Sequence, residues 1–290
     1  MHWLWFTLPA AIGTYLVFRK KSGVQLTPSK VFDGGTALDK AVRRSNPQIF
    51  VESGGGVPTL VVGLPGWGDR SDKFLQTLVN GLSLSGAYGI ATIQDPRTGG
   101  PKYQGQSGKE HANLYNLRSK DYKTLDHFIA QICQKVFGGP ANVYIVGFSM
   151  GGLAAPKVAE KLNPDGRYYV KGAVAIGAGT SASPTRLNAK KIRVLFEVAP
   201  VKRSKDKPTR SDSSNRKNAE YTVRKMKKAG VEAYLLHIPY ARKQRNWHWG
   251  LISHCRYPKF NKPNPQTMAA ASTFIEGGVP TLTSPTMESC

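Results

Sequence analysis

The order of hydrophobic and polar positions along the 290-residue chain predicts strands that alternate with helices. Short apolar runs rich in β-branched residues predict strands at 48–51, 58–63, 89–93, 142–146, 170–176, 192–198 and 233–238. Apolar residues spaced three and four apart predict helices at 71–84, 115–136, 152–162, 215–229 and 265–275. This alternation predicts an α/β fold, in which helices cover both faces of a mostly parallel sheet.

The first residues of the chain differ from the rest. Residues 3–18 carry no charge, and Arg19, Lys20 and Lys21 follow at once. A secretory signal would place its basic residues before the apolar stretch, whereas a basic flank after it favours retention of the following domain on the cytoplasmic side. The stretch is slightly short for a full span of about 20 residues, so a membrane anchor, an interfacial insertion, a cleaved segment and a packed helix all remain open. We predict a membrane-associated segment at 1–21, one domain at 22–276 and a flexible tail at 277–290.

The run V-Y-I-V-G-F-S-M-G-G-L at 143–153 carries the main chemical signal. It contains the pattern G-x-S-x-G, in which Gly147 and Gly151 allow close backbone contacts around a strained turn that presents Ser149. A strand before the turn and a helix after it are the setting that this nucleophile elbow requires. The alternative is an ordinary strand–helix turn that happens to contain a serine.

A nucleophilic serine needs a histidine as its base, and three histidines follow it. His248 lies in N-W-H-W-G-L, after the last predicted strand, where a loop leaves the ring free to turn. His237 lies inside an apolar strand and is better suited to the core or its rim, and His254 is the reserve. We predict His248 as the base, against the alternative of an exposed or packed loop histidine.

The acid that orients the histidine is expected after the strand at 192–198. Asp206 and Asp212 both follow that strand. Asp212 is the predicted acid, although it could also be the N-cap of the basic helix, and Asp206 could be a solvated charge among lysines.

Two backbone N–H groups must stabilise the oxyanion that forms on the attacked carbonyl. Met150, directly after the serine, supplies one. The second is predicted at Trp67, in G-L-P-G-W-G-D-R at 63–70, where glycines let the main chain approach the substrate. The alternative is that P-G-W-G is simply a tight turn.

With these residues in order, the chain resembles the α/β-hydrolase superfamily over about residues 58–275. The resemblance is carried by G-F-S-M-G-G at 147–152, L-P-G-W-G-D-R at 64–70, D-P-R-T-G-G at 95–100 and N-W-H-W-G-L at 246–251. It implies a serine acyl hydrolase that acts through an acyl-enzyme, with the order Ser149, Asp212, His248 and without a metal or organic cofactor.

The chain departs from the family pattern in three places. Pro65 stands where the family commonly has a histidine, and no glycine-x-Asp closely follows the strand at 192–198. The interval between Gly177 and Ile192 is too short for a helical lid, so we expect an open site. Such a site, close to Trp67 and other aromatic residues, would suit a small-molecule or lipid ester.

The charge of the chain adds a possible partner. Lys and Arg total 41 against 18 for Asp and Glu, a formal net charge of +23, and the excess is concentrated at 186–228. This favours an anionic surface, against the alternative of a solvated basic face. Because no RNA-binding motif or zinc knuckle is present, nucleic acid ranks below an anionic membrane. The sequence thus predicts a serine esterase at a membrane surface, with a noncatalytic protein of the same fold, docked through its basic face, as the alternative.

Overall fold

The computed structural model describes residues 23–66, 69–94, 117–180, 182–199, 210–238, 250–253 and 263–282, with the side chains of 210–213 excepted. Eight strands in these ranges form one sheet, in the order β1-β2-β4-β3-β5-β6-β7-β8. β2 runs antiparallel to both of its neighbours, whereas β3 to β8 are parallel. The strands are β1 (Val24–Leu26), β2 (Gln48–Glu52), β3 (Thr59–Leu64), β4 (Tyr88–Thr92), β5 (Asn142–Phe148), β6 (Tyr169–Ile176), β7 (Arg193–Val198) and β8 (Ala233–His237).

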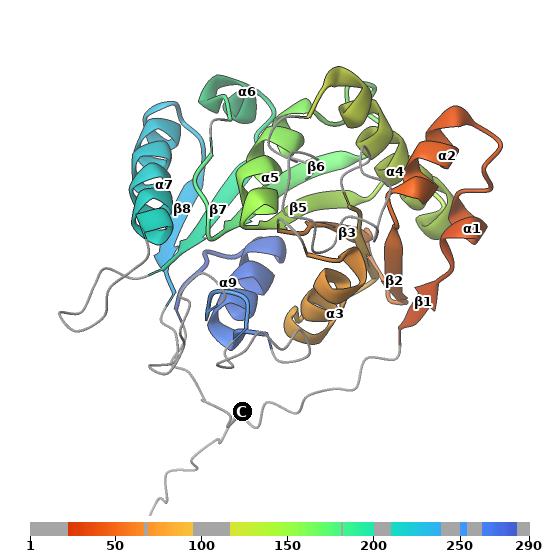
Figure 1. Ribbon diagram of the computed structural model, residues 1–290, viewed down its shortest axis with the longest axis horizontal. Helices are drawn as coiled ribbons and strands as arrows, with labels where there is room; N and C mark the ends of the chain where they lie inside the picture. Colours follow the sequence, from red (N-terminus) through yellow and green to blue (C-terminus); the bar gives the residue numbers. More distant parts are fainter. Residues whose placement is uncertain are drawn as a thin grey trace, which may run out of the picture.

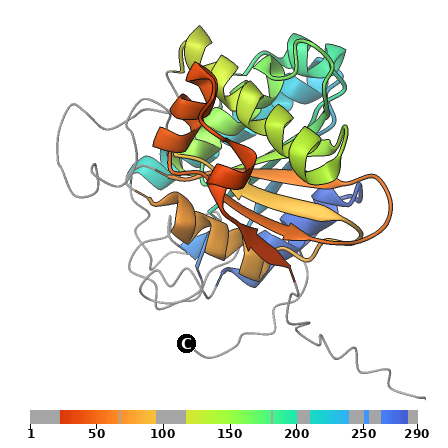
Figure 2. The same cartoon turned by 90° about the vertical axis from the view of Figure 1, so that its right-hand side faces the viewer.

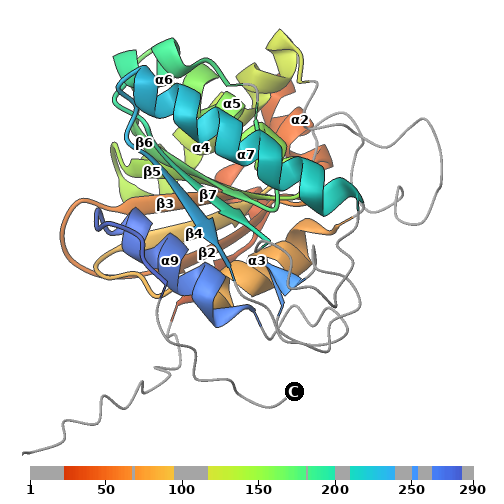
Figure 3. The ribbon, with the colours of Figure 1, turned by 90° about the vertical axis from the view of Figure 1, so that its left-hand side faces the viewer.

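Helices cover both faces of this sheet (Figure 1). α3 and α9 lie on one face, and the remaining helices lie on the other, as the two side views also show (Figures 2 and 3). The predicted fold class, a mostly parallel sheet with helices on both faces, is therefore confirmed. The helices are α1 (Pro28–Val31), α2 (Ala37–Arg44), α3 (Ser71–Gly81), α4 (Ser119–Phe137), α5 (Met150–Lys161), α6 (Pro184–Ala189), α7 (Arg210–Lys228) and α9 (Pro265–Ile275).

Each face of the sheet has its own hydrophobic core. In β3, Leu60 and Val62 pack into the cluster that includes residues of α4, α5 and α7, whereas Val61 packs into the cluster that includes residues of α3 and α9. Because both faces are buried, the central strands are continuous apolar runs rather than alternating ones. This explains why short apolar runs located the strands correctly in the sequence.

The segment before β2 is the part of the fold for which hydrophobic patterning predicts no element. It contains β1, α1 and α2. The side chain of Thr36 accepts a hydrogen bond from the Asp39 N–H, and Asp39 in turn accepts from the Thr36 N–H, which caps α2. Asp39 also contacts His127 of α4, with 2.8 Å between Oδ1 and Nε2. Polar contacts rather than an apolar face thus fix α2.

Candidate active site

The chain makes a strained turn between β5 and α5, as the sequence predicted. Ser149 has φ 55° and ψ −113°, a backbone conformation that is uncommon for a residue with a side chain. Its N–H donates to the carbonyl of Ile176 at 2.8 Å, and its carbonyl accepts from the Leu153 N–H at 3.0 Å. Hydrogen bonds to β6 and along α5 therefore hold Ser149 at the carboxyl end of the central strand.

Two glycines allow the turn to pack directly against the end of β3. A Cβ atom on Gly147 would overlap the carbonyl of Gly151, and one on Gly151 would overlap the carbonyl of Leu64. Only a residue without a side chain fits at either position. Close backbone contacts thus join this turn, called the elbow below, to the end of β3.

The predicted oxyanion donors are placed in part. Met150 is the first residue of α5, and the first N–H groups of a helix have no partner within the helix. Trp67 lies outside the described residues. Gly66, directly before it, packs against the elbow: a Cβ atom built there would lie 3.3 Å from Ser149 Cβ and 3.2 Å from Phe148 Cδ1. The loop after β3, which is predicted to carry the second donor, is therefore close to Ser149 at Gly66, its last described residue before Trp67.

Asp69 is a site residue that the sequence reasoning did not consider. Its Oδ2 lies 2.6 Å from the same Cβ position on Gly66, so its carboxyl borders the space beside Ser149. The Asp69 N–H donates to the Gly66 carbonyl at 3.1 Å. Burial raises the pKa of the Asp69 carboxyl to about 6, and a backbone hydrogen bond from Gly66 offsets this in part. The carboxyl of Asp69 therefore titrates near neutral pH next to the elbow.

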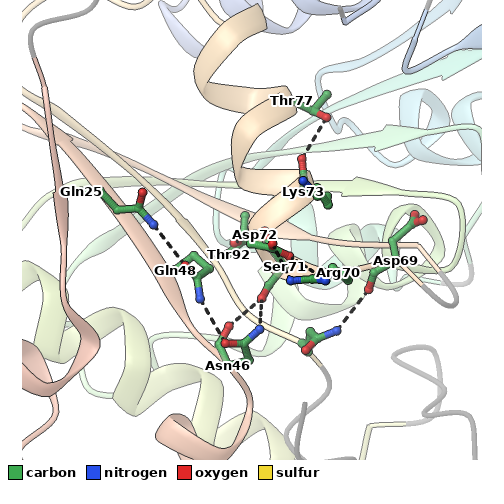
Figure 4. A network of polar contacts seen from close by, with 11 residues as sticks. Gln25, Asn46, Gln48, Asp69, Arg70, Ser71, Asp72, Lys73, Thr77 and Thr92 are labelled. Carbon is green, nitrogen blue, oxygen red and sulfur yellow. Dashed lines mark hydrogen bonds and ion pairs between the residues drawn. The ribbon is translucent and has the colours of Figure 1, made fainter. Parts of the chain in front are cut away.

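A network of polar contacts fixes the backbone around Asp69 (Figure 4). Gln94 Nε2 donates to the Asp69 carbonyl at 3.2 Å. Ser71 Oγ donates to the Asn46 carbonyl at 2.6 Å, and Thr92 Oγ1 donates to the Ser71 carbonyl at 2.8 Å. The carboxyl of Asp69 points away from this network (Figure 4), so the network contacts the main chain of Asp69 and not its carboxyl group.

A second carboxyl is buried on the other side of the elbow, at the end of β7. The side chain of Glu197 is 0 % exposed, and both of its carboxyl oxygens are buried. Within the part of the chain that the structure describes, neither oxygen has a hydrogen-bond partner. Burial raises the pKa of this carboxyl well above its usual value. Since buried polar groups are nearly always paired, Glu197 needs an explanation. Its only sequence signal was a lone acid inside the apolar strand L-F-E-V.

The predicted base and acid are not brought together by the described residues. His248, His254 and Asp206 lie outside them. Asp212 was predicted as the acid, with the N-cap of the basic helix as the alternative. The N-cap position is wrong, because α7 begins at Arg210 and Asp212 lies within the helix. The run S-D-S-S, which reads as a helix start, continues the helix instead.

His237 belongs to the sheet rather than to the elbow. It lies in β8, half-buried, two residues after Leu235, which packs against the cluster that includes residues of α7. Its Nδ1 is buried and has no hydrogen-bond partner among the described residues. This agrees with its assignment to the core or its rim.

The basic block at 186–228 divides into two groups of residues. Some are used within the fold: Arg193 Nε contacts Glu232 at 2.7 Å and its Nη1 and Nη2 donate to the carbonyls of Phe274 and Gly278, while Lys190 Nζ donates to the Leu162 carbonyl at 2.8 Å. Among the other members, Arg186 and Lys191 are exposed at and just after α6. Five more exposed members lie along α7, which runs across one side of the molecule (Figure 3): Lys217, Arg224, Lys225, Lys227 and Lys228.

The helices in the described ranges lack the length and apolar character of a membrane-spanning segment, and residues 1–21 fall outside those ranges. The same ranges contain no group of three or more His, Cys, Asp or Glu side chains that could hold a metal ion.

Comparison with known proteins gives structural neighbours only. No protein-family model and no curated protein matches the sequence. The structure is similar to that of esterase PE8, with 19 % identity over 64 % of this chain and 88 % of that chain, at a TM-score of 0.42. It is similar to LpqC, a poly(3-hydroxybutyrate) depolymerase from Bordetella parapertussis, with 11 % identity over 81 % and 85 % and a TM-score of 0.45. It is also similar to acyl-protein thioesterase 2 of Zea mays, with 16 % identity over 66 % of this chain and 88 % of that chain, at a TM-score of 0.38. At these identities and TM-scores, the functional argument rests on the site.

Proposed function

We propose that this protein is a serine hydrolase that cleaves carboxylic esters, including lipid esters or thioesters, through an acyl-enzyme intermediate. The observation that carries the proposal is the backbone of Ser149, which is held at φ 55° between the central strand and the start of α5. Backbone strain of this kind persists only where the surrounding structure enforces it, and it clusters at active sites. Here the Ser149 backbone is hydrogen-bonded at both its N–H and its carbonyl, and glycines at 147 and 151 allow the surrounding backbone to pack closely.

The proposed reaction uses the serine, a histidine and two backbone donors. Ser149 Oγ attacks the acyl carbon while the histidine, predicted to be His248, accepts the hydroxyl proton at Nε2. The N–H groups of Met150 and, by prediction, Trp67 stabilise the oxyanion. The histidine returns the proton to the departing alcohol or thiol, and a water molecule then hydrolyses the acyl-serine by the same steps in reverse. No step of this route calls for a metal or an organic cofactor.

The exposed face of α7 supports action at an anionic membrane surface. Its basic side chains adjoin Tyr221, which is 52 % exposed and carries the Lys225 ammonium group 4.6 Å from its ring centroid. Lysine and arginine attract anionic headgroups, and an aromatic ring suits the interface between headgroups and water. The apolar segment at 1–21 would add a second attachment, with the hydrolase domain on the cytoplasmic side.

The proposal is tested by labelling the serine. A fluorophosphonate probe should label the wild-type protein at Ser149, and the protein should hydrolyse short and medium acyl esters. Ser149→Ala should abolish both, while the matched variant Ser214→Ala, at an exposed position of α7, should keep both. Ester turnover that survives Ser149→Ala unchanged, without labelling of Ser149, would refute the proposal.

The exposed basic face also supports a second candidate function, a noncatalytic protein that docks on an anionic membrane or, less favoured, on nucleic acid. This reading expects binding to anionic liposomes that falls steeply with salt and survives Ser149→Ala. It also expects no ester turnover by the wild-type protein. The labelling experiment and the liposome experiment together separate the two functions.

A further inference from the structure

The carboxyl of Asp69 lies beside the proposed nucleophile. The position that a Cβ atom on Gly66 would take is 2.6 Å from Asp69 Oδ2 and 3.3 Å from Ser149 Cβ. Because both distances start from one point, Asp69 Oδ2 and Ser149 Cβ are at most 5.9 Å apart, the sum of 2.6 and 3.3 Å. An acyl carbon about to be attacked lies about 3 Å from the serine Oγ. Substituents a few bonds from that carbon therefore come within range of the Asp69 carboxyl.

Hydrogen bonds hold Asp69 in place at both its main chain and its side chain. The Gly66 N–H donates to the Asp69 carboxyl, and the Asp69 N–H donates to the Gly66 carbonyl at 3.1 Å. Gln94 Nε2 donates to the Asp69 carbonyl at 3.2 Å, and the carboxyl points away from that contact (Figure 4). A charge that is already held in position needs no reorganisation when a substrate binds, so it can discriminate between substrates.

No basic side chain of the described residues neutralises Asp69. The adjacent Arg70 binds Asp72 instead, with its Nε 2.8 Å from Oδ1 and its Nη2 2.9 Å from Oδ2. Within the described ranges, the ion pairs of Lys, Arg and His all involve other carboxylates. Burial raises the pKa of Asp69 to about 6, so the carboxyl is ionised above that pH. A negative charge without an ion-pair partner among these residues therefore lies beside the serine, in a chain with a formal net charge of +23.

A carboxylate in this position favours a cationic group on the substrate. Charges interact more strongly at a partly buried site than in water, because the effective dielectric constant is lower there. The carboxylate would attract an ammonium group of the substrate and repel a carboxylate or a phosphate. The positive charge of the whole chain acts in the opposite sense from a distance, but salt screens it beyond about 10 Å. Asp69 therefore acts on the substrate groups that come closest to the serine.

We propose that Asp69 is a specificity-determining residue of the proposed serine hydrolase, and that the enzyme prefers carboxylic esters with a cationic group a few bonds from the acyl carbon. The Asp69 carboxylate contacts the cation of the bound ester and takes no part in the proton transfers at Ser149. Neutral esters of the same shape are cleaved less efficiently, and esters with a carboxylate or phosphate at that place are cleaved least. The inference rests on the proposed function, since it names the substrate class of the same site.

Esters of matched shape and different charge test this preference. The cationic ester carries a trimethylammonium group, the neutral ester carries a tert-butyl group in its place, and the anionic ester carries a carboxylate there. The set is made once with this group in the acyl chain and once with it in the alcohol. Values of kcat/KM are measured at about pH 8, where the Asp69 carboxyl is ionised, and in about 0.5 M salt, which screens distant charges. In at least one set, the wild-type protein should prefer the cationic ester over the neutral one by about tenfold.

Asp69→Asn keeps the shape of the side chain and removes its charge. In the set that shows the preference, the ratio of kcat/KM for the cationic ester to that for the neutral ester should fall by about tenfold. The ratio for the anionic ester to the neutral ester should rise. Asp72→Asn removes the same charge from an exposed carboxyl that is bound to Arg70, so it is the matched control. Both ratios in this control should stay within about twofold of the wild type.

The inference and the proposed function can fail separately. The inference is wrong if the wild-type protein cleaves the neutral ester as efficiently as the cationic ester in both sets, a result that needs no variant to fold. It is also wrong if Asp69→Asn keeps the wild-type ratios. If Ser149 is labelled and esters are cleaved without regard to their charge, only the role of Asp69 is lost. If the wild-type protein is neither labelled nor active on any of these esters, the proposed function fails and the inference fails with it.

Discussion

A buried carboxyl lies on each side of the elbow, and the two carboxyls differ in their hydrogen bonding. On the β3 side, Asp69 has its main chain fixed by Gln94 and a backbone hydrogen bond from Gly66 to its carboxyl, and its pKa is raised to about 6. On the β7 side, Glu197 has no hydrogen-bond partner among the described residues, and burial raises its pKa well above the usual value. The β3 side is therefore organised by contacts among the described residues, whereas the carboxyl of Glu197 is buried there without a hydrogen-bond partner.

This difference shows which half of the site the backbone alone can build. The junction between the elbow and β3 consists of backbone atoms packed so closely that glycine is required. On the β7 side, the described structure shows only that the sheet register places Glu197 two strands away from Phe148 of β5. Changes on the β3 side should therefore affect folding and activity together.

The largest effect is expected for Gly151→Ala, which would break the β3 side. The added Cβ would overlap the Leu64 carbonyl, and backbone cannot move aside as a flexible side chain can. We expect a loss of about 3 kcal/mol in the free energy of unfolding, measured by urea denaturation, together with loss of fluorophosphonate labelling.

Gly139→Ala is the control for this substitution. A Cβ on Gly139 meets no atom within 4 Å, so stability and labelling should stay near those of the wild type. If Gly151→Ala were as stable and as readily labelled as Gly139→Ala, the close contact between the elbow and β3 would be contradicted.

The strands and the elbow could be predicted from the sequence because their signals are local. Continuous apolar runs reflect burial on both faces, and G-x-S-x-G needs only its neighbours to be recognised. α2 could not be found in this way, since it buries Val42 as its one apolar residue and depends on Thr36, Asp39 and the distant His127. Asp212 was misplaced because short polar residues favour helix starts, yet here they continue α7.

The two carboxyls beside the elbow could not be predicted for a different reason. Asp69 and Glu197 are acids whose chemistry depends on burial by segments far apart in the chain. The runs P-G-W-G-D and L-F-E-V do not indicate how deeply the side chains of Asp69 and Glu197 are buried. Their importance becomes visible only when the strands are placed in register and the glycines are packed against the elbow.

An intermediate effect is expected for Asp69→Asn. The stability of this variant relative to the wild type should depend on pH, because it removes the buried carboxyl on the β3 side. The carboxyl has a pKa of about 6 in the folded protein against 3.8 as its ordinary value. The folded state therefore holds this proton more tightly, and its stabilising contribution is complete below pH 3.8 and is lost as the pH rises through 6. Asn does not ionise, so the variant should gain stability relative to the wild type between pH 4 and pH 7.5, by up to about 3 kcal/mol.

Thermal unfolding at several pH values measures this gain. Asp72→Asn removes a neighbouring carboxyl that forms an exposed ion pair with Arg70, so it should change stability by less than about 1 kcal/mol at any pH. A stability difference between Asp69→Asn and the wild type that is the same at pH 4 and pH 7.5 would contradict the buried, near-neutral titration of Asp69.

The smallest effect is expected for His237→Leu. This variant tests whether a side chain on the α7 face of the sheet contributes to activity. His237 of β8 is close to Glu197 of the neighbouring strand β7, because Glu197 pairs with Leu236 and Val198 pairs with His237. Its side chain, however, belongs to the α7 face, whereas Glu197 belongs to the face of α3 and α9. Removal of its buried, unpaired Nδ1 should therefore leave stability unchanged or raise it by about 1 kcal/mol, and kcat/KM should stay within about threefold of the wild type. A loss of activity of more than about tenfold would contradict the assignment of His237 to the rim of the core.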